Sequence, residues 1–134
     1  MSSRSWRLRS WAVVLLASAG GCASTDLPGR AAPDRAPGDA DAGRQVIEDY
    51  GCGACHRIPG IRAARGDVGP SLDGIERQKL LAGRLTNTPE NLARWIQQPQ
   101  EVAPGVDMPD LGLTDDEARD AAAYLLTGGA TPDE

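Results

Sequence analysis

The sequence predicts an all-α fold in which three main helices are joined by long loops. Three segments carry the apolar spacing or the capping residues of amphipathic helices, and no segment alternates apolar and polar residues as a strand does. The segments between them are rich in glycine and proline, and loops of this length in a small domain are typical of a chain that wraps a bound group. We place the domain at residues 42–128 of the 134-residue chain.

The first helix is expected at residues 42–50. Val46 and Ile47 share one face with Tyr50 at helical spacing. Either Asp39 or Asp41 could cap its N-terminus. The helix leads directly into a cysteine-containing segment.

The second helix is expected at residues 89–98. Thr88 is a natural N-cap, and Pro89 suits the first helical position. Pro99 should end the helix. One face carries a stripe expected to be buried: Leu92, Trp95 and Ile96.

The third helix is expected at residues 115–127. Thr114 and Glu117 have the spacing of a capping box, and Gly128 with Gly129 should end the helix. A flat face of mostly small residues would let another helix approach closely: Ala118, Ala121, Ala122 and Leu125. A short helical turn is also expected near residues 72–77.

Residues 1–21 have the organisation of a secretory signal peptide. Arginines come first, then a short apolar run, then small residues before Cys22. The apolar run is well short of the ~20 residues that a membrane span needs. We therefore expect export across the cytoplasmic membrane and a periplasmic or extracytoplasmic location.

Cys22 is the expected site of lipidation. Residues 19–22, Ala-Gly-Gly-Cys, resemble the bacterial lipobox, in which the cysteine becomes the lipidated first residue of the mature chain. Cleavage after Ala19 is the alternative, and it would leave Cys22 as a spare thiol in an oxidising compartment. The proline-, alanine- and glycine-containing residues 22–41 read as a disordered linker, and residues 129–134 as a C-terminal tail.

The charge balance restricts the partners. The chain has 14 basic and 19 acidic residues and a net charge of −5. An acidic protein is repelled by phosphates, so we expect no nucleic-acid partner. We instead expect a partner protein with a basic docking face.

Residues 52–56, Cys-Gly-Ala-Cys-His, form the C-x-x-C-H signature of covalent haem attachment. On a helical turn Cys52 and Cys55 face the same way, so both sulfurs can bond one haem edge. His56 lies over the same face and can reach the iron. A zinc site would need four Cys or His ligands, whereas the chain has one histidine and three cysteines. A thioredoxin-type dithiol lacks the expected βαβ context, and a structural disulfide remains an alternative.

Met108 is the expected second axial ligand of the iron. His56 is the sole histidine, Lys79 the sole lysine, and the other methionine begins the leader. Met108 precedes Pro109 in a proline-rich loop and sits on no periodic apolar face. A role in core packing is the alternative to ligation.

The segment from residue 52 to residue 126 resembles class I cytochromes c, and most of all the cytochrome c domain fused to subunit II of some haem–copper oxidases. The resemblance implies a small cytochrome c-like fold wrapped around one covalent haem c. No oxidase transmembrane hairpin or copper-ligand segment precedes the domain, so we expect a freestanding cytochrome. The shared motifs are the haem signature, Val68 to Leu72, Thr88 to Leu92, Trp95, Pro104 to Pro109, and Ala123 to Leu125.

The same resemblance implies roles for further residues. The Pro70 carbonyl would accept a hydrogen bond from His56 and orient its ring. Trp95 would line the haem pocket, with core packing as its alternative role. Arg77 would meet a haem propionate or be a solvated surface charge. The first and last helices would cross, with Gly43 and Tyr50 against Tyr124 and Leu125.

The expected function is single-electron transfer in a bacterial extracytoplasmic respiratory chain. Ligation by His56 and Met108 would leave iron no open site, so we expect neither enzymatic activity nor a small-molecule substrate. Redox partners would be a terminal oxidase, a quinol-oxidising complex or a dehydrogenase. The alternatives are a haem-based gas sensor or haem enzyme in which Met108 is displaceable, and a binding module without haem.

Overall fold

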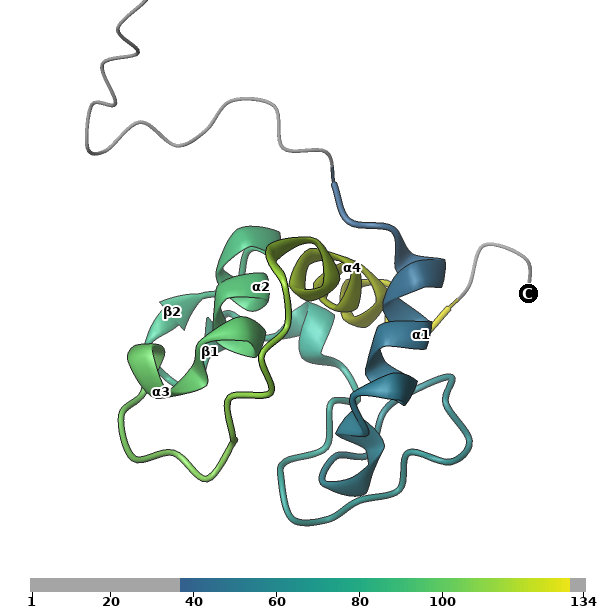
Figure 1. Ribbon diagram of the computed structural model, residues 1–134, viewed down its shortest axis with the longest axis horizontal. Helices are drawn as coiled ribbons and strands as arrows, with labels where there is room; N and C mark the ends of the chain where they lie inside the picture. The colour runs from purple at the N-terminus through teal and green to yellow at the C-terminus, as the bar shows by residue number, and fades with distance from the viewer. Residues whose placement is uncertain (1–36, 131–134) are drawn as a thin grey trace, which may run out of the picture. The chain divides into compact units, whose positions relative to one another are not determined.

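Three helices organise the domain, and α4 packs against both of the others (Figure 1). The computed structural model describes residues 37–130. In it, α1 spans Ala40–Asp49, α2 spans Pro89–Gln97 and α4 spans Asp115–Leu126. The expected signal peptide, Cys22, most of the linker and the end of the tail lie outside the described residues.

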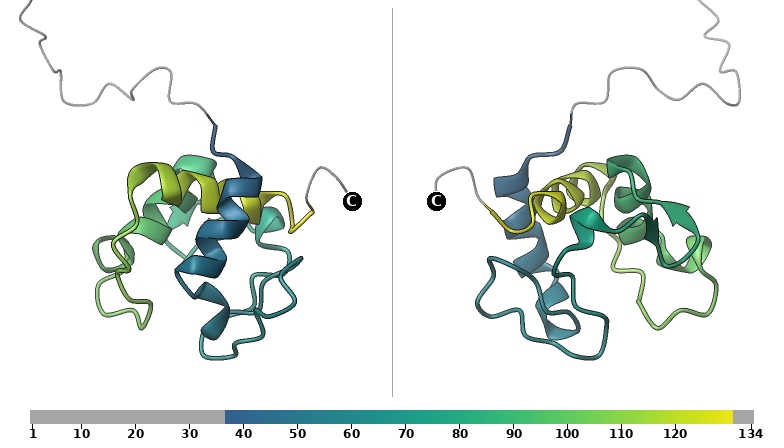
Figure 2. Two further views of the ribbon diagram at one scale, coloured as in Figure 1. Left: turned by 45° about the vertical axis from the view of Figure 1, so that its right-hand side comes forward. Right: turned by 180° about the vertical axis from the view of Figure 1, so that it is seen from behind.

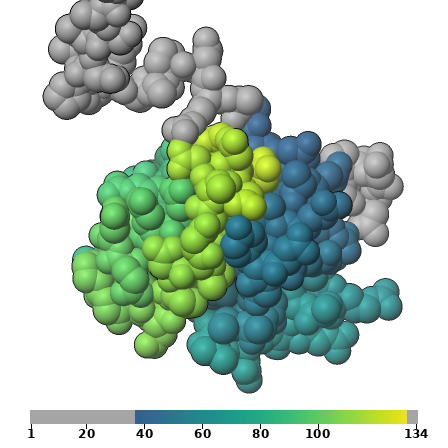
Figure 3. Space-filling model, viewed as in Figure 1, coloured from purple at the N-terminus to yellow at the C-terminus, as the bar shows by residue number. Residues whose placement is uncertain are grey.

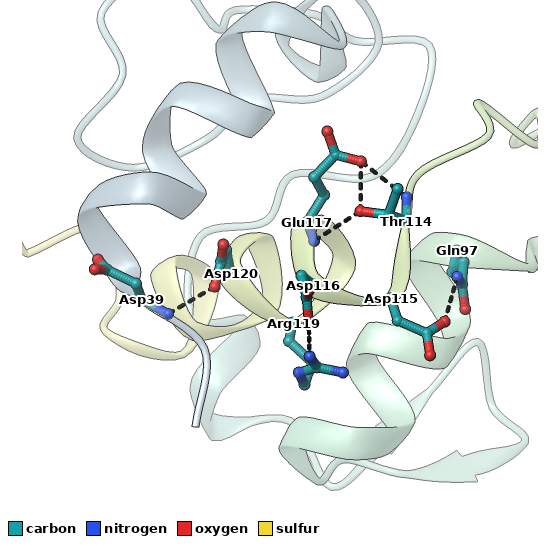
Figure 4. Close-up of polar contacts among 8 residues, drawn as sticks. All are labelled: Asp39, Gln97, Thr114, Asp115, Asp116, Glu117, Arg119 and Asp120. Carbon is teal, nitrogen blue, oxygen red and sulfur yellow. Dashed lines mark hydrogen bonds and ion pairs between the residues drawn. The ribbon is translucent and has the colours of Figure 1, made fainter. Parts of the chain in front are cut away.

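Asp39 determines where α1 begins. Its carboxylate accepts hydrogen bonds from the backbone N–H groups of Asp41, at 2.9 Å, and Ala42, at 3.2 Å. Because Asp39 rather than Asp41 is the N-cap, the helix starts at Ala40 instead of at residue 42. The Asp39 N–H also donates to the Asp120 carboxylate at 2.8 Å, which ties the start of the domain to α4 (Figure 4).

Pro99 ends α2 as expected, but it also begins a helix that the sequence did not predict. Thr88 caps α2 through a 3.2 Å hydrogen bond from the Asn91 N–H. The short α3, Pro99–Val102, follows with the buried Pro99 as its first residue, a position where a missing N–H costs nothing. On α2, Leu92 and Ile96 are buried, whereas Trp95 is only half-buried. The expected stripe is therefore completed by Ala93.

The expected capping box of α4 is present. The Glu117 N–H donates to the Thr114 hydroxyl at 3.3 Å, and the Glu117 carboxylate accepts from the Thr114 N–H at 2.8 Å (Figure 4). Gly128 and Gly129 follow the helix with φ of 68° and 81°, which glycine adopts without strain. The buried face of α4 consists of Ala118, Ala121, Ala122, Tyr124 and Leu125.

The first and last helices pack against each other, as expected. A Cβ on Gly43 would lie 1.9 Å from the Asp120 carbonyl oxygen, so the two backbones are in direct contact there. The Tyr50 hydroxyl donates to Glu117 at 3.0 Å. Tyr124, an expected partner of these residues, donates its hydroxyl to the Pro59 carbonyl at 2.8 Å.

A small β-hairpin precedes α2 and was not predicted. Strand β1, Leu80–Leu81, pairs antiparallel with β2, Leu85–Thr86. Ala82 and Gly83 make the turn with φ of 46° and 67°. Strands of two residues are too short to show an alternating pattern. The expected turn near residues 72–77 is the 3₁₀ helix η2, Ile75–Arg77.

The helices and loops divide the domain into two sides. In Figure 3, the green segments around α2 and α3 cover one side, and the blue and teal segments from α1 onward cover the other. The loop of residues 55–74 and the loop of residues 103–114 both extend to the same side of α4 (Figures 1 and 2). This places the segments that carry His56 and Met108 on a common side of the fold.

Candidate functional site

The cysteines lie on a short turn that continues from α1. Gly51, with φ of 68°, ends the α1 region, and the 3₁₀ helix η1, Cys52–Ala54, follows. The backbone N–H of His56 donates to the Cys52 carbonyl at 3.0 Å, which brings both cysteines and the histidine into one turn. Both thiols are half-buried and unpaired. The helical turn inferred from the C-x-x-C-H spacing is therefore present.

The chain beyond this turn folds back and holds it from outside. Gly66 N–H donates to the Gly53 carbonyl at 3.0 Å, and Gly69 N–H to the Cys55 carbonyl at 2.8 Å. A Cβ on Gly53 would lie 2.7 Å from Ala64, so the returning segment packs directly on the turn. The turn is thus fixed both by its own hydrogen bonds and by residues 64–69.

The His56 ring is held on two sides. Its Nδ1 donates to the Pro70 carbonyl at 2.7 Å, since that oxygen can only accept, and this is the hydrogen bond that the family resemblance implied. A Cβ on Gly69 would lie 2.4 Å from His56 Cε1, so only glycine leaves room for the ring. In the neutral ring, this hydrogen bond selects the tautomer whose proton is on Nδ1, which leaves the Nε2 lone pair available to a metal.

The Cys52 thiol is not activated for thiol chemistry. Burial raises the pKa of the Cys52 thiol above its usual value. Redox-active dithiols instead have lowered pKa values, because the thiolate is the nucleophile. Among residues 37–130, no group of three or more His, Cys, Asp or Glu side chains could hold a metal ion. These observations disfavour the dithiol and zinc alternatives.

Met108 is half-buried in the loop between α3 and α4. The side-chain amide of Gln100, on α3, donates to the carbonyls of Val106 at 2.7 Å and Met108 at 2.9 Å. Gln97, on α2, donates to the Asp115 carboxylate at 2.7 Å, close to the other end of the loop (Figure 4). The loop that carries Met108 is therefore attached near both of its ends.

Two other expected site residues are less constrained. Trp95 is half-buried and packs against the core cluster. Arg77 has a 77% exposed side chain and pairs with its neighbour Glu76. Their predicted roles toward a haem remain predictions. Sequence analysis assigned no role to Gln100, or to Gly69 within the shared motif, because a glutamine after a proline and a glycine before one carry no periodic signal.

The residues of this site fit a covalent haem. Two unpaired thiols and an imidazole with a free Nε2 lie on one turn. Half-buried apolar side chains also pack against the core cluster, Leu72, Leu85 and Trp95 among them. The donor set thus matches the group implied by the C-x-x-C-H signature.

A cavity of about 340 Å³ lies beside the attachment turn. None of Cys52, Cys55, His56 and Met108 lines it, so it is not assigned to the haem. Its lining residues are Ile47, Glu48, Gly51, Gly53, Ala54, Ile61, Ala63 and Ala64.

No helix among residues 37–130 has the length and apolar character needed to cross a bilayer.

The chain matches a known family over most of its folded part. The family model described as Cytochrome c matches residues 40–129, more than half of the chain. Cytochrome c oxidase subunit 2 of Alkalihalophilus pseudofirmus is 38% identical over 89 residues, which cover 64% of this chain and 25% of that protein. The chain thus corresponds to about a quarter of this relative.

A solved structure shares the fold. Cytochrome c2 of Paracoccus denitrificans superposes with a TM-score of 0.50 and 21% sequence identity, covering 69% of this chain and 97% of that one. At this identity the match concerns the fold alone. It agrees with the all-α, cytochrome c-like fold expected from the sequence, to which the structure adds the small hairpin.

Proposed function

The chain belongs to the cytochrome c family, and on that basis we propose that it carries single electrons on a haem whose iron is held by His56 and Met108. Proteins of this family bind haem c covalently, and Cys52 and Cys55 are the residues that would form its thioether bonds. The bound haem supplies an iron that cycles between Fe(III) and Fe(II).

The orientation of His56 is the observation that carries this proposal. The Pro70 carbonyl and Gly69 fix the ring in one tautomer and one direction, beside the two thiols. A hydrogen bond at Nδ1 also makes Nε2 a stronger donor toward a metal. The chain therefore holds His56 in an orientation that would suit iron ligation.

Met108 supports electron transfer rather than catalysis. It is the one methionine in residues 37–130, and its loop is held by hydrogen bonds from Gln100. Two protein ligands leave no coordination position for a substrate, and a methionine sulfur raises the reduction potential relative to stronger donors. A gas sensor or haem enzyme would require Met108 to leave easily.

We further propose that the domain works outside the cytoplasm on a lipid tether. The support is the signal-peptide pattern of residues 1–21 and the lipobox-like residues before Cys22. A tether would confine encounters to the membrane surface and raise the effective concentration of membrane partners. The relative is an oxidase subunit, so a terminal oxidase is our proposed acceptor, with a quinol-oxidising complex or a dehydrogenase as donor.

Replacing Met108 tests the proposed function. After expression with cytochrome maturation machinery, the oxidised parent should show the far-red iron–sulfur charge-transfer band. Met108→Ala should abolish the band and lower the potential by on the order of 0.1 V, within the ~0.8 V range that axial ligands span. Redox titration measures the shift.

Leu111→Ala is the matched control, because Leu111 is an exposed apolar residue of the same loop. It should leave band and potential unchanged. A Met108→Ala variant with the parent's spectrum and potential would contradict the axial assignment. Carbon monoxide binding to the reduced parent at neutral pH would favour the sensor or enzyme alternative.

A further inference from the structure

The loop that carries Met108 has almost no backbone structure of its own. Between residues 104 and 113, one backbone–backbone hydrogen bond is present, from Val106 N–H to the Ala103 carbonyl at 3.1 Å. Met108 and the five residues after it make none. Their conformation therefore depends on side chains: Asp110, within the loop, accepts from the Gly112 N–H at 3.0 Å, and other side chains reach the loop from elsewhere.

Gln100 makes three such contacts. Its Nε2 donates to the carbonyls of Val106 and Met108, and its Oε1 accepts from the Gly105 N–H at 3.2 Å. The amide orientation is determined by these partners. If the amide were reversed, oxygen would face two carbonyls and nitrogen would face an N–H.

The base of Gln100 is well fixed. It is the second residue of α3, directly after Pro99, which is fully buried. Ala103, one turn later, is also buried. An anchored short helix thus presents one side chain to the loop backbone from Gly105 to Met108, and the last of its contacts is on the Met108 carbonyl itself.

We propose that Gln100 is a positioning residue that holds the Met108 loop in the conformation required for iron ligation. The inference rests on the proposed function, since it assigns a purpose to these hydrogen bonds only if Met108 is a ligand. Gln100 itself touches neither the iron nor the haem in this role. It lowers the cost of binding by ordering the loop beforehand.

Gln100→Leu tests the proposal by competition with imidazole, which must displace Met108 from ferric iron. The variant loses the hydrogen bonds to the Val106 and Met108 carbonyls. Because one to two hydrogen bonds usually contribute about a factor of ten to an equilibrium, imidazole should bind about tenfold more tightly. Titration with loss of the far-red band as the signal gives the dissociation constant. Gln100→Glu should show at least the same change, because its carboxylate would repel both carbonyls.

Two variants separate this role from general effects. Gln45→Leu, at an exposed position of α1, should bind imidazole as the parent does. Gln97→Leu removes the hydrogen bonds to Leu113, at 3.2 Å, and Asp115, farther from Met108. It should change imidazole affinity less than Gln100→Leu does. If Gln97→Leu and Gln100→Leu changed the imidazole affinity equally, any loosening of the loop would be enough to expose the iron, and the proposal would be wrong.

Amide hydrogen exchange gives an independent readout. Exchange at Gly105 N–H should accelerate in Gln100→Leu but stay slow in Gln100→Glu, which retains the accepting oxygen. A parent that lacks the far-red band would refute Met108 ligation and with it the proposed function. A parent with the band, together with a parent-like Gln100→Leu, would refute this inference alone.

Discussion

His56 is held by the backbone rather than by other side chains. One side of its ring donates to the Pro70 carbonyl, and the Gly69 backbone lies against the ring carbons. Both contacts come from a segment that is itself bonded to Cys55 through the Gly69 N–H. The orientation of the proposed axial ligand therefore depends on a glycine that carries no chemistry of its own.

Gly69→Ala should disturb this ligand. The new methyl group would fall 2.4 Å from His56 Cε1, so the ring or the loop must move and the Pro70 hydrogen bond should weaken. We expect the free energy of unfolding to fall by about 1–3 kcal/mol, as overpacking usually costs, and the reduction potential to change. Urea unfolding and redox titration measure the two effects.

Val68→Ala serves as the control, since Val68 is 77% exposed and next to Gly69 in the chain. It should change neither quantity appreciably. If the two variants behaved alike, the contact between Gly69 and the ring would have no energetic role.

At the scale of elements, α1 and α4 are joined by one carboxylate. Glu117 accepts hydrogen bonds from the backbone and hydroxyl of Thr114, which caps α4, and from the Tyr50 hydroxyl at the end of α1. Hydrogen bonds from the Thr114 backbone, then from its hydroxyl and from Tyr50, lower the pKa of Glu117. The hydrogen bond to Glu117 raises the pKa of Tyr50 in turn.

This arrangement predicts a pH dependence of stability. A carboxyl group whose pKa is lowered by folding stabilises the fold above its unfolded pKa of about 4.3. That stabilisation is lost as the pH falls through the folded pKa. Glu117→Gln should therefore be less stable than the parent at neutral pH, and the difference should shrink below roughly pH 4.

Urea unfolding of both proteins at neutral and acidic pH measures this difference. Glu90→Gln, an exposed acid in the first turn of α2, is the matched control. A difference between parent and Glu117→Gln that did not vary with pH would contradict an ionised Glu117 at the helix joint.

At the scale of the molecule, charge is unevenly distributed along the chain. The net charge is −5, yet the loop after the haem signature carries Arg57, Arg62 and Arg65 and no acid before Asp67. In the Met108 loop and the start of α4, every charged side chain from Asp107 to Glu117 is acidic. The two loops that extend to the same side of α4 thus have opposite charges (Figure 1).

The net charge predicts the response to salt. A cationic ruthenium complex should exchange electrons with the protein faster at low ionic strength than at high ionic strength, where salt screens the attraction. The anionic hexacyanoferrate should exchange electrons more slowly at low ionic strength than at high ionic strength. Stopped-flow rates over a range of ionic strength test this. If the rate constants varied with ionic strength in the opposite directions, the arginines of the loop after the haem signature, rather than the net charge, would dominate the electrostatic field where the reagents react.

The sequence by itself determined the features that depend on neighbouring residues. Caps at Thr114 and Thr88 fixed two helix starts within a few residues, and the C-x-x-C-H spacing identified the attachment turn. Each of these is a local arrangement in which the interacting groups lie within one helical turn along the chain. Their geometry hardly depends on the rest of the fold.

Only the tertiary structure decided which distant segments meet. The contact of Gly43 with Asp120, the packing of Gly69 on His56 and the three bonds of Gln100 each join groups whose meeting depends on loop paths. The short hairpin and α3 likewise formed where the surrounding chain holds two- and four-residue segments in place. Because small residues and flexible polar side chains permit many registers at similar local cost, packing of the whole domain selects among them.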